Sequence, residues 1–296
     1  RRVLFRSAWR SEFFIAQANG TLEEFPLLAA VLSGVKRKGH YTGNLQKNAD
    51  VLYQFPNIQT EVHRLADTAF RTSHLRTPGR MQNTFANEAF FDELAAAAGA
   101  DPLQWRLTYL KETRARAVLE DVAKLSKWQT RPSPVGKMDG NLVRGRGVSF
   151  VKYDNDRTFV ALVAQVEVNR STGAIRVTDV WCSHDCGQVI NPDGAINQIE
   201  GGIVQTISRT LLEELQFDQT HVTSTDWASY PILRFPDVPR IHVSLINRPD
   251  MPVWGAGEMA PTVVPSAISN AVFDATGVRL RSVPFLPSKV KAAGVA

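Results

Sequence analysis

The sequence predicts an α+β fold in which mixed sheets pack against helices. Three observations carry this prediction. Apolar residues recur at helical spacing over about residues 86–126, alternate with a period of two over 160–168, and return to helical spacing from residue 193. Helices and strands therefore come in blocks, whereas a doubly wound parallel sheet would show them alternating one by one.

The first block contains three predicted helices. Apolar residues over 86–97 form one face of the first helix, and Gly99 is placed to end it. Asp101 is a typical N-cap residue and Pro102 suits the first helical position, so a second helix begins there. The third helix covers about residues 114–126.

The second block follows residues 131–141, whose prolines and glycines indicate a linker or a long turn. Residues 160–168 and the return strand from residue 175 form a predicted hairpin, joined by a turn over 169–174. The elements after the hairpin are a long helix, a strand and a final helix, over residues 193–215, 241–245 and 266–276. Gly277 closes the last of them.

Composition excludes several classes of protein. The 296 residues carry 34 Lys and Arg against 29 Asp and Glu, a net charge of +5, but the basic residues are scattered and form no stripe that would indicate nucleic acid. No apolar run approaches the ~18 residues of a membrane-spanning helix. Two cysteines cannot build a disulfide framework or hold an iron–sulfur cluster.

The first seven residues, RRVLFRS, lack the apolar stretch of a secretory signal. They resemble the translation of a sequencing adapter. We interpret residues 1–7 as a non-native segment and expect the natural chain to begin further upstream.

Cys182, His184 and Cys186 form a C-x-H-x-C string that suggests zinc. In an extended strand the two cysteines would lie ~13 Å apart with parallel side chains. Ligand atoms of one zinc ion must converge to within about 4.6 Å of one another. We therefore predict a structural role for these residues and no metal bound by protein side chains.

Residues 255–260, GAGEMA, match the dinucleotide fingerprint only in form, because a loop precedes them and Pro261 and Pro265 delay the next helix. The same segment can be interpreted around Glu258. The flanking glycines permit a ligand to approach closely, and the carboxylate could serve as a general base. The alternative is a solvated glutamate in a glycine turn.

Two other segments each allow more than one interpretation. Arg76 precedes the turn Thr77-Pro78-Gly79, which could bind an anion or be an ordinary surface turn. Gln198 and Glu200 precede a pair of glycines on the predicted long helix. A glycine inside a helix costs ~1 kcal/mol relative to alanine, so we expect something to pack very close there.

Five stretches, taken together and in order, resemble the molybdopterin-binding large subunit of the xanthine dehydrogenase/aldehyde oxidase family. The nearer resemblance is to the bacterial branch with the large subunits of isoquinoline 1-oxidoreductase and nicotinate dehydrogenase. The stretches are LRTPGRMQNTFANEAFFDELAAAAGADPLQWRL (75–107), GRGVSFVKYD (145–154), and those at 184–215, 226–239 and 247–281.

The resemblance implies a molybdenum hydroxylase, an oxidoreductase acting on an N-heteroaromatic carbon or an aldehyde with water as the oxygen donor. Glu258 falls on the family's catalytic glutamate, the general base. Arg76 falls on an arginine near the molybdenum, with Gly79 in the same loop, and Gln198 on a glutamine beside the pterin. The metal is implied to be held by a molybdopterin cofactor, expected in the cytosine dinucleotide form.

The same resemblance implies a partner and a division of the chain. Electrons must leave the metal, so a small iron–sulfur subunit with two two-iron clusters is expected. Residues 8–135 would be part of one molybdopterin-binding subdomain, and 136–296 a second one carrying the glutamate. A cytoplasmic location is favoured over a periplasmic one.

Two departures from the family pattern qualify these expectations. Met259 stands where a proline usually follows the glutamate. A glycine- and glutamine-bearing segment that contacts the molybdenum is not found, so we expect a C-terminal fragment, incomplete at the N-terminus and inactive alone.

Three alternatives remain at this stage. One is an aldehyde oxidase-type enzyme. Another is a relative of carbon monoxide dehydrogenase, which needs a cysteine- or selenocysteine-bearing loop that is not visible. The third is a non-catalytic binding or assembly module that kept the fold, against which Glu258 favours an enzyme.

Overall fold

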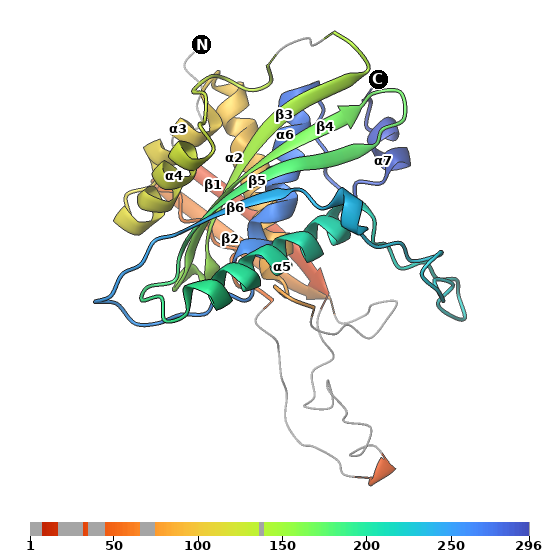
Figure 1. The fold of residues 1–296 in the computed structure, drawn as a ribbon, viewed down its shortest axis with the longest axis horizontal. Coiled ribbons are helices and arrows are strands. Elements are labelled where there is room, and N and C mark those ends of the chain that lie inside the picture. The colour runs from red at the N-terminus through yellow and green to blue at the C-terminus, as the bar shows by residue number, and fades with distance from the viewer. Residues whose placement is uncertain (1–7, 17–31, 35–44, 66–74, 136–138, 296) are drawn as a thin grey trace.

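The computed structural model describes residues 8–16, 32–34, 45–65, 75–135 and 139–295. The segment that we interpret as non-native, residues 1–7, lies outside this part of the chain. The described residues form a central four-stranded sheet and a separate two-stranded sheet. Helices cover both faces of the central sheet (Figure 1). The predicted α+β class is confirmed.

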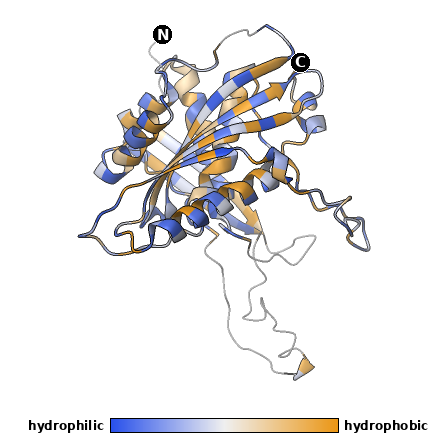
Figure 2. Ribbon diagram, in the orientation of Figure 1, coloured by the Kyte–Doolittle hydropathy of each residue, from blue (hydrophilic) through white to orange (hydrophobic). Residues whose placement is uncertain are grey.

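The central sheet has the strand order β3 (Leu142–Lys152), β4 (Phe159–Asn169), β5 (Ile175–Asp185) and β6 (Arg240–Leu245). The first three strands are antiparallel, and β6 lies parallel to β5. The predicted hairpin is β4 and β5, and the predicted strand over 241–245 is β6. Hydrophobic and hydrophilic residues follow one another along these strands, which Figure 2 shows as bands of orange and blue.

Strand β3 was not predicted, because Gly145 and Gly147 occupy positions where an apolar alternation would be expected. Helix α6 (Val264–Thr276) packs directly on these glycines. A Cβ atom at Gly147 would lie 2.2 Å from the backbone oxygen of Ala267. The two glycines therefore allow the helix to approach the sheet closely.

Helix α6 corresponds to the predicted final helix, and Gly277 ends it with φ +75°. Helix α5 (Pro192–Leu211) covers the same face of the sheet and corresponds to the predicted long helix, which ends four residues earlier than expected. A short helix α7 (Pro287–Ala292), which was not predicted, follows near the C-terminus.

The opposite face of the sheet carries the helical block, α2 (Arg80–Ala97), α3 (Pro102–Tyr109) and α4 (Thr113–Leu125). All three correspond to predicted helices. The Asp101 side chain accepts hydrogen bonds from the backbone N–H groups of Leu103 and Gln104 at 3.0 and 2.8 Å, which confirms the predicted cap.

The two-stranded sheet consists of β1 (Ala8–Ala16) and β2 (Asn57–Leu65), which are parallel. Trp9 joins this sheet to the helical block through aromatic contacts with Phe90 and Phe91 of α2. One apolar cluster contains both Phe91 and Phe159, so side chains from before and after residue 135 pack against each other. The division into 8–135 and 136–296 stays a prediction. Among the described helices, none combines the length and apolar character that a membrane span requires.

Candidate active site

Arg76, Gln198 and Glu258 come from distant parts of the chain and meet in one place. Arg76 lies in the loop before α2, and Gln198 lies on α5. The Arg76 Nη2 atom donates hydrogen bonds to the backbone and side-chain oxygens of Gln198 at 3.1 and 2.9 Å. Its Nε atom donates to the backbone oxygen of Gly257, next to Glu258. One guanidinium therefore ties the loop, the helix and the glycine turn together.

The turn at Glu258 leads into a 3₁₀ helix, Ala260–Val263, and then into α6. This context confirms that GAGEMA does not connect a strand to a helix as a dinucleotide site requires. Met259 is buried and occupies the N-cap position of the 3₁₀ helix without a capping side-chain hydrogen bond. Pro261 stands inside that 3₁₀ helix.

Glu258 is half-buried, and both of its carboxylate oxygens accept hydrogen bonds. The backbone N–H of Thr77 donates to Oε1 at 3.4 Å, and the Tyr153 hydroxyl donates to Oε2. The alternative of a merely solvated glutamate therefore does not describe this side chain. Sequence reasoning missed Tyr153 as a site residue, although it lies in the stretch GRGVSFVKYD that contributed to the resemblance.

The electrostatics of the site keep a proton on Tyr153. Burial raises the pKa of the Tyr153 phenol, and the hydrogen bond to Glu258 raises it further. The phenol is therefore protonated at neutral pH and acts as a hydrogen-bond donor. For Arg76, partial burial lowers the pKa, and the Glu258 carboxylate offsets part of this effect.

Close packing at the glycines keeps these segments together. A Cβ atom at Gly202 of α5 would lie 2.6 Å from Pro261 Cγ and 3.2 Å from Arg76 Cζ. One at Gly257 would lie 3.3 Å from Gln198 Oε1. The expected close contact at the glycine pair is thus present at Gly202, whereas a Cβ atom at Gly201 would meet nothing within 4 Å.

Gly79 has a different neighbour. Its φ is +74°, and a Cβ atom there would lie 2.7 Å from the backbone oxygen of Leu45. The space beside this glycine is filled by the chain itself, so its small size serves packing. Its predicted contact with a cofactor stays a prediction.

The hydrogen-bond donors of Arg76 and Gln198 suit a large anionic ligand whose edge also carries polar groups. Gln198 is exposed, and its side-chain nitrogen has no hydrogen-bond partner among the described residues. Arg76 adds a guanidinium, which favours phosphate and carboxylate oxygens. Neither side chain is a usual ligand of a transition metal, so these residues fit a cofactor that brings its own metal ligands.

The Arg76–Gly79 loop also lines a cavity of about 480 Å³. Thr77 connects the two regions, because it lines this cavity and its N–H contacts Glu258. Phe13, Phe14 and Leu75 give the cavity a largely apolar wall. It is large enough for a single aromatic ring system.

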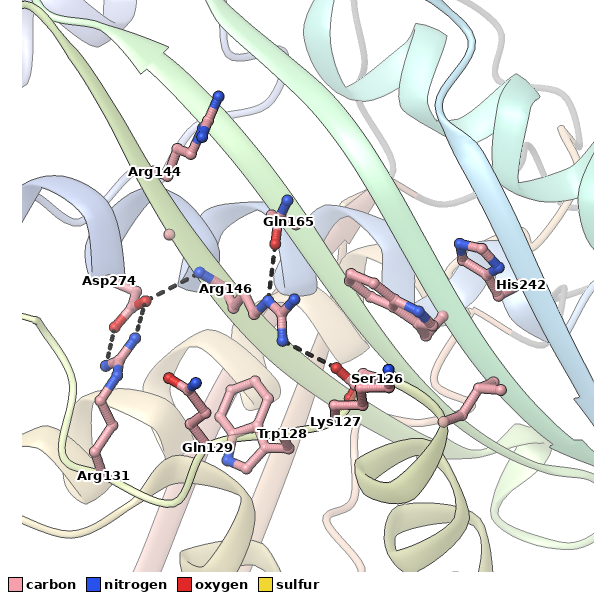
Figure 3. A pocket seen from close by; sticks show the side chains of 13 residues that line it. Ser126, Lys127, Trp128, Gln129, Arg131, Arg144, Arg146, Gln165, His242 and Asp274 are labelled. Carbon is pink, nitrogen blue, oxygen red and sulfur yellow. Dashed lines mark hydrogen bonds and ion pairs between the residues drawn. The ribbon is translucent and has the colours of Figure 1, made fainter.

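A larger cavity, of about 700 Å³, lies beside the C-terminal end of α4, and its lining side chains are drawn in Figure 3. None of the four predicted site residues lines it. Its arginines already have partners in the chain. Arg131 pairs with Asp274 at 2.8 Å, and Arg146 donates to Gln165 Oε1 and to the Ser126 backbone oxygen, both at 2.9 Å. We therefore assign this cavity no part in the reaction.

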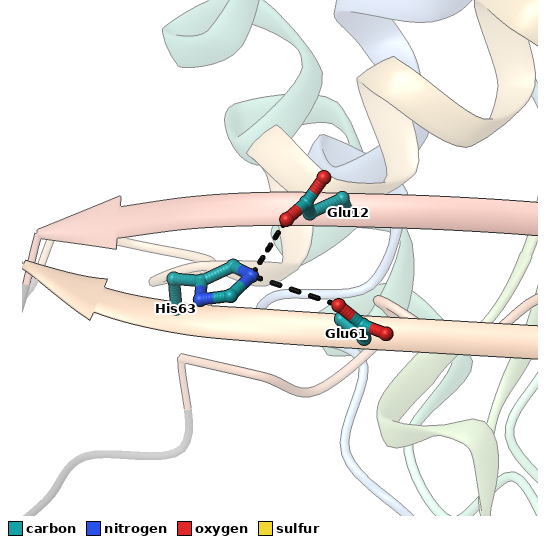
Figure 4. Close-up of side chains that lie close together, drawn as sticks. All are labelled: Glu12, Glu61 and His63. Atoms are coloured by element: carbon teal, nitrogen blue, oxygen red, sulfur yellow. Dashed lines mark hydrogen bonds and ion pairs between the residues drawn. The ribbon is translucent and has the colours of Figure 1, made fainter.

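Figure 4 shows a cluster of potential metal ligands on β1 and β2. His63 Nε2 lies 2.8 Å from Glu12 Oε1 and 3.8 Å from Glu61 Oε2. All three side chains are well exposed, and a hydrogen bond between His63 and Glu12 accounts for the grouping of these two. We do not interpret this surface cluster as a metal site.

Cys182 and Cys186 are free and buried, and His184 between them is fully buried on β5. The predicted structural role agrees with this burial. Full burial lowers the pKa of His184 to about 4, although the neighbouring Asp185 opposes that effect. The imidazole is therefore neutral at pH 7.

Comparisons with known proteins point to one family. Two family models, both described as a molybdopterin cofactor-binding domain, match residues 91–239 and 18–110. A chain of the nicotinate dehydrogenase of Pseudomonas putida is 37% identical over 248 residues, which are 81% of this chain and 21% of that protein. The beta subunit of isoquinoline 1-oxidoreductase of Brevundimonas diminuta is 36% identical over 216 residues, 73% of this chain and 27% of that protein.

The solved structure of the aldehyde oxidoreductase from Desulfovibrio gigas superposes with a TM-score of 0.73 at 17% identity. The match covers 98% of this chain and 48% of that structure. At this identity the likeness shows a shared fold. The chain spans about a fifth to a quarter of the length of the two curated relatives named above.

Proposed function

The chain belongs to the family of molybdopterin cofactor-binding domains, and on that basis we propose that it forms the catalytic part of a molybdenum hydroxylase. The proposed reaction is the hydroxylation of a carbon in an N-heteroaromatic ring or an aldehyde, with water as the oxygen donor. The observation that carries this proposal is the meeting of Arg76, Gln198 and Glu258 through the Arg76 guanidinium.

Arg76 and Gln198 would hold the cofactor. The guanidinium suits an anionic oxygen, and the exposed amide of Gln198 suits the polar edge of a pterin. The chemistry that this cofactor supplies when bound is a two-electron oxidation of the substrate. Gly202 and Gly257 keep the helix and the catalytic turn close enough for these residues to act at one place.

Glu258 is proposed as the general base. A carboxylate can take a proton and release it again during each turnover. The Thr77 N–H donates a hydrogen bond to it, and the Arg76 guanidinium interacts with it electrostatically. The Tyr153 hydroxyl cannot replace it as the base, because burial keeps the phenol protonated.

A heteroaromatic substrate is favoured over an aldehyde for two reasons. The relatives from Pseudomonas putida and Brevundimonas diminuta carry nicotinate and isoquinoline, both heteroaromatic, in their names. The apolar cavity beside Thr77 has room for an aromatic ring. An aldehyde is the second candidate, supported by the fold shared with aldehyde oxidoreductase.

Electron transfer is proposed to require another chain. Cys182 and Cys186, the two cysteines of the sequence, are both buried and together fall short of the four ligands of one cluster. We therefore propose a partner subunit with two two-iron clusters. The cofactor is proposed to be the cytosine dinucleotide form of molybdopterin.

The experiment that tests this function replaces Glu258 with Gln in the complete protein with its iron–sulfur partner. We expect Glu258→Gln to retain molybdenum and lose roughly 100-fold or more in turnover, because a neutral amide cannot accept the proton. Glu200→Gln, a nearby change on α5, should keep normal turnover. Near-normal turnover of Glu258→Gln would refute the base assignment. A panel of heterocycles and aldehydes then decides between the two substrate classes.

A further inference from the structure

We propose that Tyr153 is a positioning residue that holds one oxygen of the Glu258 carboxylate and leaves the other, Oε1, to receive the proton. This inference rests on the proposed function of Glu258 as the general base. Tyr153 and Glu258 lie 105 positions apart in the sequence, and the hydroxyl of Tyr153 donates to Oε2.

Tyr153 is well suited to fix a second side chain because it is itself fixed. Only 4% of the residue is exposed, and its backbone N–H donates to the Thr158 oxygen at 2.8 Å. The Arg80 guanidinium lies 5.5 Å from the centre of its ring, and Arg80 is held in place by Asp154 at 2.7 Å. A donor that does not move needs no reorganisation when charge shifts on its acceptor.

The turn that carries Tyr153 is built by the Asn48 side chain. Asn48 accepts a hydrogen bond from the Asp154 N–H at 3.0 Å and donates one to the Lys152 oxygen at 2.7 Å. Asp154 and Asn155 both have positive φ, a conformation that Asp and Asn adopt more readily than most residues. These contacts end β3 in a tight turn and direct the phenol towards Glu258.

The two carboxylate oxygens of Glu258 are not equivalent in this arrangement. Oε2 accepts from a hydroxyl group, whereas among the described residues Oε1 accepts only from the Thr77 N–H, at a long distance of 3.4 Å. Oε1 therefore keeps the more available lone pairs. A base whose acceptor atom is oriented in advance loses less of its rate to misalignment.

The first test is Tyr153→Phe in the complete, cofactor-loaded protein with its partner subunit. This change removes the hydroxyl and keeps the ring. We expect kcat to fall about 10- to 100-fold, with KM within about twofold and molybdenum content unchanged. Tyr230→Phe is a matched control, because it removes a tyrosine–glutamate hydrogen bond of 3.0 Å to Glu213 outside the site, and kcat should stay normal.

A second readout does not depend on turnover. The infrared carboxylate band of Glu258 is identified as the band that disappears in Glu258→Gln. We expect this band to change frequency in Tyr153→Phe and not in Tyr230→Phe, because only the first variant changes the hydrogen bonding of Oε2.

Two results would overturn the proposal: an unchanged kcat in Tyr153→Phe, whether or not KM rises, or an unshifted Glu258 band. A failure of the proposed hydroxylase function would look different from these results. If the unaltered complex with bound molybdenum oxidises none of the substrates tested, the proposed function fails, while the infrared comparison still supports or refutes the Tyr153–Glu258 contact.

Discussion

Arg76 and Gln198 are 122 positions apart, and a single guanidinium nitrogen of Arg76 contacts both the backbone and the side-chain oxygen of Gln198. The same side chain also donates to Gly257. It therefore fixes the distance between α5 and the turn of the proposed base. A residue with three such contacts has a structural part to play, which an experiment can separate from its proposed part in holding the cofactor.

We expect Arg76→Lys in the complete protein to lose molybdenum and about tenfold or more of its turnover. An ammonium group cannot reproduce the planar fork that reaches Gly257 and Gln198 together, and each charged hydrogen bond contributes about 1.5–3 kcal/mol. Metal analysis and steady-state kinetics are the measurements. The control is Arg281→Lys, because Arg281 is exposed and pairs with Glu93. Full molybdenum content in Arg76→Lys would contradict the assigned role.

The glycine pair on α5 offers a matched comparison within one helix turn. Gly202→Ala should lower the free energy of unfolding by about 1–3 kcal/mol, because the new methyl group would overlap Pro261. Gly201→Ala should raise it by about 0.5–1 kcal/mol, because alanine favours the helix and the space is open. Urea unfolding of both variants checks this. Equal effects at the two positions would show that close packing is not the reason for Gly202.

Local signals in the sequence explain what could be predicted of the fold. The cap at Asp101 and the end at Gly277 depend on neighbouring backbone groups only, so sequence proximity is enough to foresee them. The apolar character of β4 reflects burial on both faces of a central strand. These features need no knowledge of distant contacts.

Distant contacts explain what could not be predicted. Arg106 is fully buried in α3, where its partners Glu88 and Asp92 come from α2, and a charged residue gives no sequence sign of such burial. Tyr153 became a site residue only through its contact with Glu258. The convergence of Arg76, Gln198 and Glu258 was implied by a resemblance, whereas their spacing alone did not indicate it.

His184 leads to a prediction about acid stability. Both ring nitrogens are buried without a hydrogen-bond partner among the described residues, and burial lowers the pKa to about 4 from an ordinary value of 6.5. Between these two pH values the unfolded chain binds a proton that the folded chain does not. The free energy of unfolding therefore falls as the pH drops from 6.5 towards 4. The fall is at most roughly 3 kcal/mol. Below pH 4 this group causes no further loss of stability.

His184→Leu should remove this part of the acid sensitivity, because leucine fills a similar volume and does not titrate. Urea unfolding at pH 7 and pH 5 measures the effect as the difference between the two free energies of unfolding. That difference should shrink in His184→Leu. At pH 7 the leucine variant should be at least as stable as the unaltered chain, since it no longer buries two unpaired nitrogens. An undiminished pH dependence in His184→Leu would show that other groups cause the acid sensitivity.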